Sequence, residues 1–145
     1  MLGCGFAAEY LLGGNGMRIF LRATDGGFLA DEDAVGFSFG AVDDTGAEHY
    51  VNLQRQPEDW PPDEDWGIHL EFDNQAHSSY GCVGACRIDR ERLSIDLCKP
   101  LGPGTLAKVE GFDISLTGID DGTYRDLISG LPRAFRDFET LLSIA

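Results

Sequence analysis

Apolar and polar residues alternate in several short segments of the chain, with the period of a half-buried β-strand. Val35, Phe37 and Phe39 alternate with small or polar residues, and Val51 and Leu53 repeat the pattern after a turn at residues 43–46. These two runs predict a hairpin. By the same reasoning we expect strands at residues 18–23, 35–41, 49–56, 68–72, 80–88, 93–98 and 109–116.

The connections between these strands carry turn and breaker residues. Asp25-Gly26-Gly27 predicts a turn, and residues 73–79 predict a polar connection. Residues 57–65 contain three prolines, which remove backbone donors, so this segment cannot be a central strand. We expect it to be an exposed acidic loop.

The C-terminal segment changes to a helical period. An apolar stripe with spacings of three, four and one is formed by Tyr124, Leu127, Ile128, Leu131, Phe135, Phe138 and Leu142. Asp120 or Asp121 can cap its start, while Gly130 and Pro132 should kink or split the helix. The predicted fold is α+β: a mostly antiparallel sheet of six or seven strands, with this amphipathic helix packed on one face.

The length of 145 residues suits one domain, which we place at residues 17–145. Residues 1–16 end in a Gly-rich stretch and are treated as an N-terminal extension. They are either an upstream addition, with Met17 as an alternative start, or a short element that docks on the domain. They make a poor signal peptide, and no stretch of the chain is apolar enough for a membrane helix.

Charge is the strongest compositional signal, with a net charge of −14. Residues 23–86 hold fourteen of the 25 acidic residues but only one base, Arg55. Such a surface repels phosphate backbones, which argues against nucleic-acid binding, and it attracts basic proteins. The alternative is a solvated face that only keeps the protein soluble.

The residues that most often carry chemistry form no recognisable site. Cys4, Cys82, Cys86 and Cys98 are interpreted as reduced cytosolic thiols, mostly in the core. Cys82 and Cys86 with His77 match no zinc motif, and His49 and His69 are expected on outward strand faces. There is no phosphate-binding loop, dinucleotide fingerprint, nucleophile elbow or calcium loop. We therefore expect no cofactor and no metal.

Two tryptophans, Trp60 and Trp66, flank the acidic centre of the Pro-rich loop. Tryptophan is enriched in interface hot spots, and prolines pre-organise a loop, so the segment could be a binding element. Alternatively, both rings fold back onto the sheet and hold the loop in place.

The segment from residue 34 to residue 135 resembles the immunity protein 10 family of bacterial polymorphic toxin systems. The residues that carry the likeness are Tyr50–Arg55, Ile68–Gln75, Ser79-Tyr80-Gly81, Arg87–Leu97, Val109–Leu116 and a helix after Asp120-Asp121. The pieces are short and mostly strand-forming. Residues 1–16 and those beyond Phe135 fall outside the likeness, and the loop at Pro61-Pro62 is longer.

The resemblance implies a non-catalytic cytoplasmic antidote that blocks a cognate toxin by binding it. We expect a monomer or a weak homodimer. The acidic stretch would meet a basic toxin domain. The partner-binding residues that we predict are Glu58, Asp59, Trp60, Asp63, Glu64, Asp65, Trp66 and Asp73.

Two other functions remain open from the sequence. One is a small hydrolase-like enzyme that uses His69 with Glu71 or Asp73. The other is a structural or regulatory subunit that forms homo-oligomers through an uncovered face of the sheet.

Overall fold

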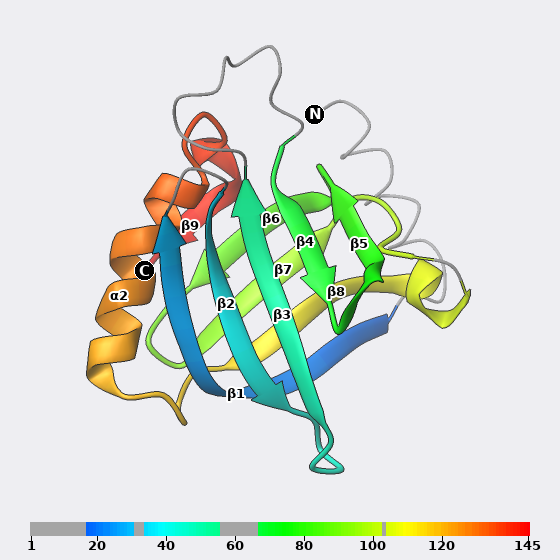
Figure 1. Ribbon diagram of the computed structural model, residues 1–145, viewed down its shortest axis with the longest axis horizontal. Helices are drawn as coiled ribbons and strands as arrows, with labels where there is room; N and C mark the ends of the chain where they lie inside the picture. The colour runs from blue at the N-terminus through cyan, green and yellow to red at the C-terminus, as the bar shows by residue number, and fades with distance from the viewer. Residues whose placement is uncertain (1–16, 31–33, 56–66, 103) are drawn as a thin grey trace.

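The computed structural model describes residues 17–30, 34–55, 67–102 and 104–145. Nine strands form one open, mostly antiparallel sheet in the order β5-β4-β3-β2-β1-β8-β7-β6-β9 (Figure 1). Their bounds are β1 Met17–Ala30, β2 Val35–Val42, β3 Glu48–Arg55, β4 His69–Phe72, β5 Asn74–Tyr80, β6 Val83–Ile88, β7 Arg92–Leu97, β8 Val109–Ser115 and β9 Leu142–Ile144. The single α-helix of the described residues is α2, Asp121–Ala134, and short 3-10 turns cover Gly104–Lys108 and Glu139–Leu141.

The sheet is strongly curled, so that two parts of it face each other (Figure 1). One part comprises β2 to β5, and the other comprises β6 to β8. The ring of Phe72 on β4 lies 5.2 Å from that of Phe112 on β8, centroid to centroid, which shows that the two parts pack against each other. We call them the front layer and the rear layer.

Strand β1 belongs to both layers. Its first half pairs in parallel with β8, from Met17 to Arg22, and its second half pairs antiparallel with β2, from Arg22 to Ala30. The register shifts between Ala23 and Asp25, so a bulge lies where the strand passes from one layer to the other. The turn predicted at residues 25–27 is therefore wrong: this segment is an irregularity within one long strand.

Alternating residues place the core between the layers, as the sequence pattern predicted. Phe39, Leu53 and Leu70 project inward from the front layer and are fully buried. Ile95 and Ile114 do the same from the rear layer. The α+β class and the mostly antiparallel sheet are confirmed, but the sheet has more strands than the six or seven expected. The additional edge strands are β5, in the segment predicted as a polar connection, and β9, in the segment predicted as helix.

Helix α2 packs against β1 and β2 at the side of the sheet (Figure 1). The side chain of Asp120 accepts a hydrogen bond from the main-chain N–H of Thr123, 2.7 Å away, which confirms the predicted cap. The helix is continuous through Gly130 and Pro132 and ends at Ala134, so the predicted split is wrong. Pro132 lies in the last turn, where its missing N–H removes only a hydrogen bond near the end of the helix.

Candidate functional site

Seven of the eight predicted partner-binding residues lie outside the described residues. They are Glu58, Asp59, Trp60, Asp63, Glu64, Asp65 and Trp66. The eighth, Asp73, lies in the tight turn between β4 and β5 with a left-handed backbone, at a φ of 68°. Its Oδ1 accepts a hydrogen bond from the main-chain N–H of Tyr50 at 3.0 Å, so it also connects this turn to β3.

The remaining oxygen of Asp73 accepts a hydrogen bond from His49. Oδ2 of Asp73 lies 2.7 Å from Nδ1 of His49, and Oδ2 of Asp43 lies 2.8 Å from Nε2 of the same ring. The ring can donate to both carboxylates only as the imidazolium cation, so this arrangement favours the protonated form. The hydrogen bonds from Asp43 and Asp73 raise the pKa of His49. The imidazole also stacks on Phe72, with ring centroids 5.2 Å apart.

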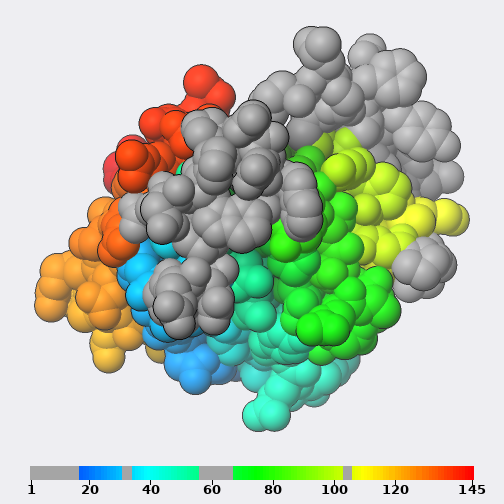
Figure 2. Space-filling view, turned by 45° about the horizontal axis from the view of Figure 1, so that its top comes forward, coloured from blue at the N-terminus to red at the C-terminus, as the bar shows by residue number. Residues whose placement is uncertain are grey.

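This position of His49 differs from the expected outward face. His49 shares the inward side of β3 with Val51 and Leu53, and its side chain is only 20% exposed. With Asp43 and Asp73 it forms what we call the His49 clamp, which joins the β2–β3 turn to the β4–β5 turn. In Figure 2 the cyan β2–β3 turn and the green β4–β5 segment lie side by side at the lower edge of the molecule.

Asp43 is fixed by its own turn as well as by the clamp. Its Oδ1 accepts hydrogen bonds from the main-chain N–H and the hydroxyl of Thr45, at 2.8 and 2.6 Å, and from the N–H of Ala47 at 3.1 Å. Thr45, followed by His49, lowers the pKa of Asp43 far below its usual range. The predicted turn at residues 43–46 is thus confirmed, with the side chain of Asp43 as its centre.

The acidic side chains of the front layer and its turns lack exposed basic partners. In residues 34–55 and 67–80, the acids are Asp43, Asp44, Glu48, Glu71 and Asp73. The one Arg or Lys of these ranges is Arg55, which is 3% exposed and donates to the main-chain carbonyl of Arg136 after helix α2. The accessible part of this layer therefore carries carboxylates without a compensating exposed Arg or Lys.

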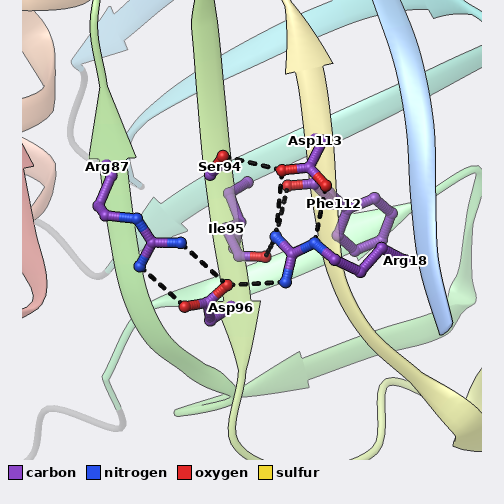
Figure 3. A network of polar contacts seen from close by, with 7 residues as sticks. All are labelled: Arg18, Arg87, Ser94, Ile95, Asp96, Phe112 and Asp113. Atoms are coloured by element: carbon purple, nitrogen blue, oxygen red, sulfur yellow. Dashed lines mark hydrogen bonds and ion pairs between the residues drawn. The ribbon is translucent and has the colours of Figure 1, made fainter. Parts of the chain in front are cut away.

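The outward side of the rear layer carries a different arrangement, centred on Arg18 of β1 (Figure 3). Its Nε lies 2.7 Å from Oδ2 of Asp113, and its Nη1 lies 2.8 Å from Oδ1 of Asp96. Arg87 donates to the other oxygen of Asp96 at 2.9 Å, and the hydroxyl of Ser94 donates to Asp113 at 2.8 Å. Two arginines and two aspartates thus neutralise one another across four strands. We call these residues the rear ion network.

The hydrogen bonds of this network decide the protonation of its carboxylates. Burial raises the pKa of both Asp96 and Asp113, but hydrogen bonds outweigh it and the net pKa of each is lowered. The donors are Arg87 and Arg18 for Asp96, and Arg18 and Ser94 for Asp113. Both aspartates are therefore anionic at neutral pH. Sequence reasoning missed the network, although its polar positions alternate with the core residues of β7 and β8.

The contacts of His69 do not form the His/carboxylate pair of the hydrolase interpretation. Nδ1 of His69 is buried without a hydrogen-bond partner among the described residues, and burial lowers its pKa. Its ring packs instead against Tyr80, with centroids 4.6 Å apart. Glu71 accepts the hydroxyl of Tyr50, and Asp73 is engaged by His49.

Two of the cysteines fit the expectation of buried reduced thiols. Cys82 and Cys86 are free and fully buried, and burial raises the pKa of each thiol to about 12. Cys98 is buried but disulfide-bonded, so the interpretation of all four as reduced thiols is wrong for this residue. Cys4 lies outside the described residues. Within the described part of the chain, His, Cys, Asp and Glu side chains form no group that could hold a metal ion.

Comparisons with protein-family models, with curated proteins and with solved structures found no significant match to this chain. None of the helices in the described residues has the length and apolar character needed to cross a membrane.

Proposed function

We propose that this chain is a non-catalytic immunity protein of the bacterial cytoplasm, which neutralises a cognate toxin by binding a basic surface of it. The observation that carries the proposal is the unbalanced charge of the front layer. Asp44 and Glu48 are exposed beside the His49 clamp, while Arg55 is buried. The resemblance of residues 34–135 to immunity protein 10 sequences supplies the biological class.

The His49 clamp favours a binding role for this end of the molecule. Both nitrogens of His49 are engaged by carboxylates, at 2.7 and 2.8 Å, so neither is available to accept a proton from a substrate. The clamp holds two acidic turns in one position. A pre-organised charged surface loses less conformational entropy on association and speeds the encounter with an oppositely charged partner.

The direct test is binding to the product of an adjacent toxin gene. The purified chain should bind that toxin domain, and its co-expression should protect cells from the toxin. Reversing two exposed acids, with Asp44→Lys and Glu48→Lys, should slow association about tenfold or more at low salt, and the effect should shrink as salt is added.

A matched control separates local contact from net charge. Asp126→Lys with Glu139→Lys changes the net charge by the same amount at exposed positions of α2 and the turn after it. The control variant should associate almost as fast as the wild type. Equal effects of the two double variants would contradict a specific acidic surface, and absence of both binding and protection would overturn the immunity function.

A further inference from the structure

The outward side of the rear layer has the opposite character from the front layer. Strand register places Arg22 of β1 and Arg92 of β7 on either side of Ser115 of β8. Neighbouring strands are about 4.8 Å apart, so the two arginines start from backbone positions about 10 Å apart. Both are exposed, and within the described residues neither side chain makes a hydrogen bond or an ion pair.

Neither arginine forms an ion pair of the rear ion network, although the charge of Arg92 helps to lower the pKa of Asp113. Arg18 and Arg87 are already balanced by Asp96 and Asp113 (Figure 3). In the register rows that run from Arg18 to Asp96 and from Arg22 to Arg92, Arg22 and Arg92 are the charged side chains outside the network. The network also fixes the strands beneath them, because one guanidinium spans carboxylates from two different strands.

An exposed aromatic ring lies in the next register row. Phe20 pairs with Asp113 on β8, one row from the pair of Arg22 with Ser115. It is 67% exposed, the largest value among the exposed large apolar side chains of the described residues. An aromatic side chain beside arginines on a rigid strand face has the composition of an interface hot spot.

Shallow grooves lie on either side of Arg92. One, of about 260 Å³, includes Phe20 and Arg22 in its lining, and another, of about 420 Å³, includes Arg87 and Ser143. Carboxylates also line these grooves. Asp43 accepts hydrogen bonds within its own turn and from His49 of the clamp. Asp89 accepts hydrogen bonds from two main-chain N–H groups in the β6–β7 turn. Asp44 is exposed.

We propose that the surface formed by Phe20, Arg22 and Arg92 binds an acidic segment of a second protein, in which an apolar side chain is flanked by carboxylates. The apolar side chain would cover Phe20, and the carboxylates would pair with the two guanidinium groups, which are suited to bidentate contacts. This surface adjoins the acidic one of the proposed function, because Asp43 and Asp44 line the same groove as Phe20 and Arg22. A nucleic acid fits less well, because two guanidinium groups do not form the extended basic stripe that follows a phosphate backbone.

The test uses a fluorescein-labelled synthetic peptide in which one leucine is flanked on each side by glutamates, with fluorescence anisotropy as the readout. The full chain should bind this peptide but not the peptide with lysines in place of the glutamates. Arg22→Ala with Arg92→Ala should raise Kd about tenfold or more, and Phe20→Ala should do the same. Added salt should weaken binding to the wild type.

The control variant is Lys99→Ala with Arg125→Ala, which removes two exposed cations elsewhere and should leave Kd unchanged. Thermal unfolding should be the same for all variants, since the substituted side chains are exposed. Failure of the peptide to bind, or equal Kd values for the wild type and the Arg22/Arg92 variant, would overturn the proposal. Tighter binding of a single-stranded DNA of the same length would assign the surface to nucleic acid instead. Because the peptide experiment contains no toxin, its failure would leave the proposed immunity function untouched. That function is tested separately by toxin binding.

Discussion

Nδ1 of His49 lies 2.7 Å from Oδ2 of Asp73, and this contact joins β3 to the turn that follows β4. Nε2 of the same ring contacts Asp43 in the β2–β3 turn. Asp43 and Asp73 raise the pKa of His49, so the folded state holds the proton more tightly than the unfolded chain does. The stability of the protein should therefore depend on pH through this residue.

The direction of this pH dependence follows from the directions in which the pKa values of His49 and Asp43 are shifted. Below about pH 6.5 the imidazole is protonated in both states, so its stabilisation is complete, and it is lost as pH rises through the raised pKa of the folded state. Asp43 has the opposite pH dependence. Because its pKa is lowered in the folded state, its contribution to stability is lost as pH falls below about 4. The clamp is thus most effective between these limits.

The variant His49→Gln should lower the free energy of unfolding most at about pH 5 to 6 and least at about pH 9. Urea unfolding at a series of pH values measures this. His77→Gln is a suitable control because the side chain of His77 contacts Asn74 and lies outside the clamp. A loss for His49→Gln that stays constant with pH would show that the ring acts by packing on Phe72 alone.

Arg55 should be required for stability because it is 3% exposed and holds the segment after α2. Its guanidinium donates to the carbonyl of Arg136, lies 3.9 Å from a carboxylate oxygen of Asp137, and packs over the ring of Phe138. Arg55→Leu should cost about 1–3 kcal/mol in urea unfolding, since a buried acceptor loses its donor. The exposed helix substitution Arg125→Leu should change stability by less than about 0.5 kcal/mol. Similar losses of unfolding free energy for Arg55→Leu and Arg125→Leu would show that Arg55 does not hold this segment.

Gly111 should not tolerate a side chain. A Cβ added there would lie 2.4 Å from the carbonyl oxygen of Ile95 and 2.5 Å from Nη1 of Arg18, so the rear ion network would have to move. Gly111→Ala should destabilise the protein by about 1–3 kcal/mol. Gly27→Ala on β1 meets no atom within 4 Å and should be neutral or slightly stabilising. Thermal unfolding of the two variants compares them directly, and an unchanged Tm for Gly111→Ala would contradict the packing.

Cys82 and Cys86 should be inert in the folded protein. Burial raises the pKa of each thiol to about 12, so almost no thiolate exists at about pH 8. Iodoacetamide labelling followed by mass spectrometry should modify them only after denaturant is added. Labelling of either residue in the native protein would mean that the sheet opens locally at β6.

The strands that the sequence predicted correctly are those in which one face is buried. Phe37 and Phe39 on β2, like Leu93 and Ile95 on β7, project alternately into the core. The strand β5 has mostly polar residues because it lies at the edge of the sheet, so it carries no alternation to detect. Leu142 continued the helical stripe by spacing but pairs with Cys86 on β6 instead. Residue spacing does not show whether Leu142 lies in a helix or in a strand; only its contact with β6 does.

The candidate surfaces could be predicted only in part. The uneven distribution of charge is visible in the sequence, and in the described residues the front layer has Arg55 as its one Arg or Lys. The His49 clamp depends on Asp73, which is 24 residues away in the chain, and the ion pair of Arg18 with Asp113 spans 95 residues. Such pairs are set by strand register, which alternation alone does not determine.

Strand β1 has a consequence for the order in which the protein can be completed during synthesis. Its early partner, β2, follows almost directly, but Met17 pairs with Val109, near the other end of the chain. During synthesis β1 therefore leaves the ribosome long before β8, the strand that pairs with its first half. The nascent chain must keep that half unpaired until β8 emerges, and the two layers can close only then.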